Sequence, residues 1–217
     1  MKPLLIAIAF LRIDIESGAV TEREWPAGEE AVAIGSLAKP FVALAYAEGH
    51  GYVYPRHRCE ANTCWLPRGH GEVGVEDAIA QSCNTYFAWM RKEVRAELLE
   101  STVRRFGLVS ADRAGPEALL RAYVELQRRA AEPGVEPILT GLRRAAGQGT
   151  AKLVGRDALA KTGTAECGHR PKAAGDGYAV VLVPAVAPKT AVLVRLHGRP
   201  GSHAAREAGR ALGSVLK

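Results

Sequence analysis

The sequence predicts an α+β fold in which both ends of the chain build one antiparallel sheet around a mostly helical middle region. Apolar and polar residues alternate with a period of two near the start and in the last third, as in strands. The middle instead has the i, i+3, i+4 spacing of amphipathic helices. We therefore expect a single domain over 1–217, with a sheet lobe from about 1–35 and 150–217, flanked by the terminal helix, and a helical lobe from about 36–149.

The first predicted element is a strand over Leu4–Ile15, which a turn at 16–18 connects to a short second strand. Its apolar start also resembles an export signal. However, Arg12 and Asp14 soon interrupt the apolar run, and no small-residue cleavage site follows. We therefore interpret this segment as part of the sheet, and we expect any export signal to lie outside the given sequence.

The helical region begins at Ser36, whose residue type is typical of a helix N-cap. A Gly- and Pro-rich stretch over 49–74 separates the first helix from the others. The predicted helices are Ser36–Ala47, Val75–Gln81, Asn84–Arg105, Pro116–Ala131 and Pro137–Ala146. The period then changes again, which predicts strands over Asp157–Ala165, Tyr178–Val183 and Thr190–His197 and a closing helix over Ser202–Leu216.

Length and charge exclude several classes of protein. With 217 residues the chain is long enough to bury a core without a metal or a disulfide, and it has no apolar run of about 20 residues that would span a membrane. The net charge of +6 comes from basic pairs within the helical segments, with glutamates nearby. Because aromatic residues do not interleave with these pairs, we expect no nucleic-acid partner.

The cysteines allow three interpretations. Cys59 and Cys64 are close enough to form a local disulfide in an oxidising compartment, and we favour that pairing over free thiols. A zinc site would combine these cysteines with the histidines His57, His70 and possibly His169. Their spacing fits no strong zinc-finger pattern, so we expect no metal and no cofactor. Cys83 is assigned to packing, because free cysteines are commonly buried.

Ser36 and Lys39 form the first of three motifs that suggest chemistry. Residues three apart on a helix share a face, so the lysine amine is expected beside the serine hydroxyl as its base. Burial or a second cation would bring the pKa of Lys39 towards neutrality, and Lys161 is the candidate for that cation. The alternative is a serine cap followed by a solvated lysine.

Ser82 and Asn84 form the second motif, in a predicted turn between two helices. The hydroxyl of Ser82 is suited to relay a proton, and the amide of Asn84 to bind a substrate carbonyl. Turn and capping chemistry alone would also explain both residues.

The third motif is Lys161-Thr162-Gly163-Thr164, in a predicted strand. Alternation places Lys161 and Gly163 on one face and the threonines on the other. Gly163 would leave room for a peptide along the strand edge, while Thr162 and Thr164, with Lys161, would bind a carboxylate. The amide of Thr164 is expected to pair with that of Ser36 as an oxyanion hole. A surface strand with a bulge is the alternative.

At these residues the sequence resembles the penicillin-binding protein and serine β-lactamase superfamily, most closely the transpeptidase domains of high-molecular-weight penicillin-binding proteins. Residues 35–41 (GSLAKPF) resemble their Gly-Ser-x-x-Lys-Pro-Phe segment, and residues 81–87 (QSCNTYF) their Ser-Cys-Asn-x-x-Phe segment. Residues 160–166 (AKTGTAE) resemble their Gly-Lys-Thr-Gly-Thr-Ala-Glu segment. The likeness runs from about Glu16 to the C-terminal helix.

The resemblance implies an active site between the sheet and the helical lobe. It implies that Ser36, assisted by Lys39, attacks a D-Ala-D-Ala-type stem peptide of peptidoglycan, and that Ser82, near Lys161, passes a proton to the leaving amine. Asn84 would hold the substrate amide, and Thr162 and Thr164 its carboxylate. β-Lactams would acylate the same serine. The resemblance also implies an extracytoplasmic location and association with a membrane or cell-envelope complex.

The sequence departs from the family in its size. The intervals between the three motifs are short, so we expect small loops and an open site. No glutamate is assignable to the activation of a deacylating water, since Glu166 belongs to the third motif's flank. A D,D-transpeptidase or D,D-carboxypeptidase is the leading hypothesis. A serine β-lactamase and a β-lactam or muropeptide sensor without turnover are the alternatives.

Overall fold

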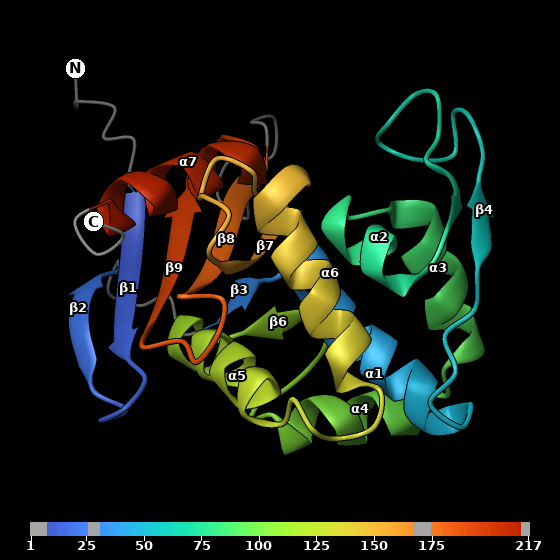
Figure 1. The fold of residues 1–217 in the computed structure, drawn as a ribbon, viewed down its shortest axis with the longest axis horizontal. Coiled ribbons are helices and arrows are strands. Elements are labelled where there is room, and N and C mark those ends of the chain that lie inside the picture. Colours follow the sequence, from blue (N-terminus) through green and yellow to red (C-terminus); the bar gives the residue numbers. More distant parts are fainter. Residues whose placement is uncertain (1–7, 26–30, 167–174, 214–217) are drawn as a thin grey trace.

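Within the described residues the sheet has five antiparallel strands, which come from the first and last parts of the sequence. A computed structural model describes residues 8–25, 31–166 and 175–213. The strand order is β2 (Val20–Glu24), β1 (Ile8–Asp14), β9 (Thr190–Leu196), β8 (Asp176–Val183) and β7 (Leu159–Ala165). Among the described residues β7 therefore forms one edge, which faces the helical lobe (Figure 1). The predicted α+β class is confirmed.

Helices cover both faces of the sheet (Figure 1). The C-terminal helix α7 (Gly201–Leu212) lies on one face. The helical lobe on the other side contains α1 (Lys39–Gly49), α2 (Val75–Ala80), α3 (Asn84–Glu93), α4 (Ala96–Arg105), α5 (Pro116–Arg128) and α6 (Val135–Gln148). Two short strand pairs complete it: β3 (Val32–Ala33) with β6 (Arg113–Ala114), and β4 (His57–Cys59) with β5 (Gly71–Val73). A 3₁₀ turn, η1 (Gly35–Ala38), precedes α1.

The alternation of side chains along β8 explains this layering. Tyr178, Val180 and Leu182 belong to the core between the sheet and the helical lobe. The intervening Ala179, Val181 and Val183 belong to a second core against α7. All eight residues of β8 are buried, because the strand is covered on both faces.

Two local predictions are wrong. The helix expected over Asn84–Arg105 is two helices, because Val94 and Arg95 have extended backbones that end α3 and begin α4. Val94 is 9% exposed and packs into the core at this break. Ser36 is not an N-cap: it lies within η1, and the α-helix begins at Lys39, where Pro40 occupies the first turn that proline favours.

Three expectations fall partly outside the described residues. They are the start of the first strand at Leu4, the end of the last helix at Leu216 and the contribution of His169 to a zinc site. Within the described part of the chain, no helix is long and apolar enough to cross a membrane.

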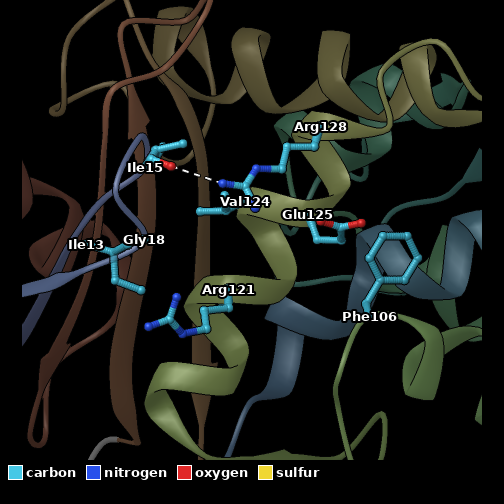
Figure 2. Close-up of a pocket in the computed structure, with 8 residues that line it drawn as sticks. All are labelled: Ile13, Ile15, Gly18, Phe106, Arg121, Val124, Glu125 and Arg128. Atoms are coloured by element: carbon cyan, nitrogen blue, oxygen red, sulfur yellow. Dashed lines mark hydrogen bonds between the residues drawn. The ribbon is translucent and has the colours of Figure 1, made fainter.

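A small cavity marks where α5 packs against the end of the sheet (Figure 2). Its volume is about 170 Å³, and its walls include Ile13 beside the β1–β2 turn and Val124 of α5. At its edge, Arg128 donates a hydrogen bond of 3.0 Å to the carbonyl oxygen of Ile15. This contact attaches the helical lobe to the sheet on the face opposite α7.

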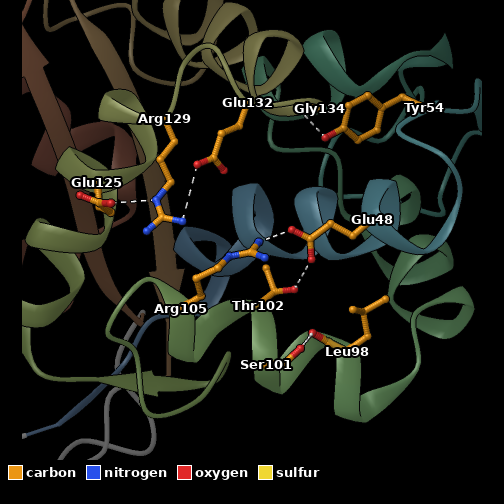
Figure 3. Close-up of polar contacts among 10 residues, drawn as sticks. All are labelled: Glu48, Tyr54, Leu98, Ser101, Thr102, Arg105, Glu125, Arg129, Glu132 and Gly134. Atoms are coloured by element: carbon orange, nitrogen blue, oxygen red, sulfur yellow. Dashed lines mark hydrogen bonds and ion pairs between the residues drawn. The ribbon is translucent and has the colours of Figure 1, made fainter.

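Polar contacts join the helices within the helical lobe (Figure 3). Glu48 of α1 accepts hydrogen bonds from the hydroxyl of Thr102, at 2.8 Å, and from the guanidinium of Arg105, both in α4. The hydroxyl of Tyr54 donates to the carbonyl of Gly134 at 2.7 Å, which connects the loop after α1 to the start of α6. These contacts hold α1, which carries Lys39, in a fixed place.

Removal of the Thr102 hydroxyl is expected to loosen the α1–α4 contact. Thr102 is fully buried, so Thr102→Val leaves the Glu48 carboxylate with one donor fewer and should lower the free energy of unfolding by about 1–2 kcal/mol. Ser101→Ala is the matched control, because its exposed hydroxyl bonds only to its own helix, and it should change stability by less than about 0.5 kcal/mol. Urea denaturation measures both values. Equal losses in the two variants would contradict this account.

Candidate active site

A cleft of about 550 Å³ opens between the edge strand β7 and the helical lobe. It contains residues from all three motifs, which lie far apart in the sequence. Among the predicted site residues, Ser36, Ser82, Asn84, Thr162, Gly163 and Thr164 line it. Lys39 and Lys161 are buried behind this lining, with 8% and 0% of their surfaces exposed. The fold therefore gathers all eight predicted site residues in one region.

Ser36 is carried by the 3₁₀ turn η1, which packs closely against β7. Gly35, immediately before it, has a φ of +48°, and a Cβ there would lie 2.7 Å from the carbonyl oxygen of Thr164. Only glycine tolerates both the positive φ and this approach. The backbone at Gly35 therefore lies against that of Thr164, which keeps the neighbouring Ser36 beside β7.

Lys39, at the start of α1, points its amine into the second motif. Its Nζ donates hydrogen bonds to the carbonyl oxygen of Ser82 and to Oδ1 of Asn84, both at 2.7 Å, and to Oγ of Ser82 at 3.2 Å. Burial lowers the pKa of Lys39 to about 8, although the thiols of Cys83 and Cys64 partly oppose this shift. The predicted depression of this pKa therefore has burial as its main cause.

Lys161, on β7, approaches Ser82 from the other side. Its Nζ donates to Oγ of Ser82 at 2.9 Å and to the carbonyl oxygen of Thr162 at 2.6 Å. Burial first, and the nearby charge of Lys39 second, lower the pKa of Lys161 well below its usual value. One hydroxyl thus lies between two buried amines, and neither amine forms an ion pair with a carboxylate in the described part of the chain.

The backbone at Ser82 is strained, and this conformation directs the Ser82 hydroxyl towards the two lysines. Ser82 has a φ of +50°, which is uncommon for a residue other than glycine. It lies between the end of α2 and the start of α3, where Cys83 caps α3 by accepting a hydrogen bond of 3.5 Å from the amide of Tyr86. The strained turn places the Ser82 hydroxyl towards the lysines and Asn84 beside it.

The third motif lies at the cleft. Its glycine, Gly163, has a further role beside the predicted one of leaving room for a peptide. A Cβ at Gly163 would lie 3.0 Å from the Leu37 side chain, so this glycine makes room for η1 rather than for a bound peptide alone. The hydroxyl of Thr162 bonds to that of Thr150 at 2.6 Å. Oγ1 of Thr164 accepts a hydrogen bond of 3.2 Å from the amide of Gly201 at the start of α7.

Several cleft residues carried no chemical signal in the sequence. Trp65, which is 50% exposed, comes from the loop between β4 and β5, and its indole donates to the carbonyl of Gln81 at 3.1 Å. The other members of this group are Gln148, Lys152 and Ser202. They reach the cleft only through the folding of α6, the segment after it and α7, so spacing in the sequence could not identify them.

The predicted disulfide between Cys59 and Cys64 is wrong, because both residues are free thiols, as is Cys83. These three sulfurs and a ring nitrogen of His70 lie within 4.8 Å of one another. Burial raises the pKa of Cys83 to about 12. At Cys64 burial also raises the pKa, but backbone amides, those of Thr85 and Asn84 foremost, lower it overall to about 7. Cys59 thus belongs to a group of four side chains and does not have Cys64 as a single partner.

No protein-family model matches the sequence, and no curated protein matches it. Solved structures do match. The structure of PBP2 from Pseudomonas aeruginosa, in complex with WCK 5153, is 18% identical with a TM-score of 0.75, and the match covers 97% of this chain and 71% of that one.

Two further structures agree with that match. A PBP2 from Helicobacter pylori, in complex with MreC, is 15% identical with a TM-score of 0.78, over 96% of this chain and 60% of that one. The transpeptidase domain of penicillin-binding protein 3 from Burkholderia pseudomallei is 16% identical with a TM-score of 0.77, over 97% of this chain and 87% of that one. The chain described here thus has the fold of the transpeptidase domains of penicillin-binding proteins.

Proposed function

We propose that the chain is a penicillin-binding acyl-serine transferase. Its substrate is a peptidoglycan stem peptide ending in D-Ala-D-Ala, and its activity is that of a D,D-transpeptidase or D,D-carboxypeptidase. The observation that carries the proposal is the Ser82 hydroxyl, which lies 3.2 Å from Nζ of Lys39 and 2.9 Å from Nζ of Lys161, at the wall of the cleft that Ser36 lines.

In the first step of the proposed reaction, Oγ of Ser36 attacks the carbonyl carbon of the penultimate D-Ala. The neutral amine of Lys39 accepts the hydroxyl proton. The oxygen of the tetrahedral intermediate receives hydrogen bonds from the amides of Ser36 and Thr164. Lys39 must be neutral at this point, because a charged ammonium has no lone pair to accept a proton.

In the second step, the peptide bond breaks and the leaving amine needs a proton. The proton moves from Lys39 to Oγ of Ser82, and the Ser82 hydroxyl proton moves to the leaving nitrogen. Lys161, as the second donor to Oγ of Ser82, positions this hydroxyl. The leaving D-Ala departs, the acyl group stays on Ser36, and water or an acceptor amine then releases it.

Substrate binding is assigned to the edge of β7. Because β7 has a free edge on the cleft side within the described residues, an extended peptide is able to add to it through backbone hydrogen bonds. Asn84 would bind the peptide amide, while Thr162 and Thr164 would bind the terminal carboxylate. A β-lactam presents the same two groups, so it would acylate Ser36 by the same steps.

The test is the intact mass of the protein after incubation with a penicillin. We expect the wild type to gain the mass of one penicillin, because ring opening adds the whole molecule to Ser36, and we expect Ser36→Ala to gain none. None of the described residues that line the cleft is Asp or Glu, so no carboxylate is in place to activate water. The adduct should therefore persist for hours. Rapid release would favour a β-lactamase, and no adduct on folded protein would contradict the proposal.

The rate of acylation is expected to rise with pH. Burial lowers the pKa of Lys39 to about 8, so only about a tenth of the molecules hold the neutral base at pH 7. The rate constant should increase roughly tenfold per pH unit below this pKa and level off above it. Stopped-flow measurements between pH 6 and 9 provide this profile. A rate that is flat or falls across that range would contradict the role of Lys39.

We place this activity outside the cytoplasm, where peptidoglycan is cross-linked. The structure of the Helicobacter pylori protein, which has a similar fold, was solved in complex with MreC. This supports association of the present chain with an envelope complex. Because the chain spans 60% of that protein, its partners are part of the proposal.

A further inference from the structure

Four side chains that have no role in the proposed reaction converge beside the cleft. Cys59 ends β4, Cys64 lies in the following loop, His70 precedes β5, and Cys83 lies between α2 and α3. Their three sulfurs and one histidine nitrogen all lie within 4.8 Å of one another. Segments that are separate in the fold thus direct four ligand atoms to one point.

We propose that Cys59, Cys64, His70 and Cys83 bind a structural zinc ion. Three cysteines and one histidine form one of the donor sets of closed, four-coordinate zinc sites. Zinc–sulfur distances of about 2.3 Å in a tetrahedron put neighbouring ligand atoms roughly 3.8 Å apart. The Cys59 sulfur and Nδ1 of His70 are 3.4 Å apart, close to that separation. Soft thiolates select zinc over magnesium or calcium.

The surroundings of the sulfurs fit bound thiolates. The amide of Asn84 donates to the sulfur of Cys64 at 3.2 Å, and the amide of Tyr86 donates to the sulfur of Cys83 at 3.5 Å. Such donors stabilise the negative charge on metal-bound sulfur and orient the ligands. No carboxylate belongs to this group among the described residues, so the thiolates are its source of negative charge.

Two metal-free explanations account for the group less well. A disulfide would use two of the three thiols and leave the third thiol and His70 without a reason to converge. A cluster of hydrogen-bonded thiols would rely on sulfur, which is both a weak donor and a weak acceptor. Nδ1 of His70 contacts the Cys59 sulfur at 3.4 Å, and Nε2 is buried without a hydrogen-bond partner in the described part of the chain, so weak sulfur contacts alone would have to hold this buried ring by hydrogen bonding.

The position of Cys83 gives the zinc ion a consequence for the cleft. Cys83 lies between Ser82 and Asn84, both of which accept hydrogen bonds from Lys39. Zinc would fasten this strained turn to the β4–β5 segment, which also brings Trp65 to the cleft. The four ligands are therefore positioning residues for the second motif. This consequence rests on the proposed function, whereas zinc binding itself does not.

Metal content tests the proposal without reference to activity. We expect the protein, produced with zinc and kept under a reductant, to contain one zinc ion per chain by mass spectrometry of the metal. His70→Ala should lose it, and His70→Cys should keep it, because four thiolates also form a zinc site. His57→Gln is the matched control, since His57 is a nearby histidine outside the group of four. It should retain zinc.

A second measurement separates loss of metal from failure to fold. Cobalt(II) added to metal-depleted wild type should give the visible absorption of a tetrahedral ion and the charge-transfer bands of thiolate ligands. Removal of zinc by a chelator should lower the melting temperature by roughly 10 °C, because a tightly bound ion stabilises the folded state by mass action. It should also slow acylation by penicillin while Ser36 remains the modified residue.

Three results would overturn the zinc site. The first is a folded wild type that neither contains zinc nor takes up zinc or cobalt under reducing conditions. The second is an intact mass that shows a disulfide among these cysteines in protein isolated without reductant but with zinc present. The third is full zinc content in His70→Ala. If penicillin fails to react with zinc-loaded protein, the proposed function fails but the zinc site stands.

Discussion

Replacement of Lys39 by methionine is expected to slow the acylation of Ser36 by about 10³-fold, the loss typical of a missing general base. Methionine fills a similar volume but accepts no proton, and it leaves Oδ1 of Asn84 and the carbonyl oxygen of Ser82 without the donor at 2.7 Å. The remaining rate should lose its dependence on pH near 8. Stopped-flow acylation with a chromogenic β-lactam measures both effects.

Lys92→Met is the control for this variant, because Lys92 is exposed in the last turn of α3 and should leave the acylation rate unchanged. Thermal unfolding of both variants shows whether the protein remains folded. If folded Lys39→Met reacts at the wild-type rate, Lys39 is not the base, and Lys161 becomes the candidate.

Substitution of Gly35 by alanine should damage both the stability and the site. The residue has a φ of +48°, and the added Cβ would lie 2.7 Å from the carbonyl oxygen of Thr164. Strain at the positive φ together with the clash should lower the free energy of unfolding by about 3 kcal/mol. Because relief of the clash moves Ser36 away from β7, acylation should slow by at least about tenfold.

Gly107→Ala separates the two causes. Its φ is +77°, but nothing lies within 4 Å of the position of a Cβ, so only the backbone strain remains. We expect a loss of about 1 kcal/mol and an unchanged acylation rate. Equal losses of stability at the two positions, measured by urea denaturation, would show that the approach of η1 to β7 does not constrain residue 35.

Much of this fold follows from patterns in the sequence. Residues 178–183 of the buried strand β8 and residues 191–194 of β9 are apolar runs, and α5 begins at Pro116, a residue that favours the first turn of a helix. The break between α3 and α4 had no such marker. Val94 and Arg95 are neither glycine nor proline, and the helix ends there because of the tertiary packing of Val94, which no local pattern records.

The candidate site, like the fold, could be predicted only in part from the sequence. The motif residues identified the serines and lysines, because residue type and order carry that information. The contact between Ser82 and both lysines depends on a φ of +50° at Ser82 and on the depth of burial, which only the fold provides. The sequence assigns Cys83 to packing, because free cysteines are commonly buried, and gives no sign that its neighbours in space are Cys59, Cys64 and His70.

The central claim is that Ser36 transfers the acyl group of a stem peptide. The most direct measurement is the release of D-alanine from a synthetic peptide ending in D-Ala-D-Ala, by wild type and by Ser36→Ala. We predict release by the wild type, increasing with pH through about 8, and none by the variant. A folded wild type that is acylated by penicillin yet releases no D-alanine would contradict the claim and identify the chain as a binding domain.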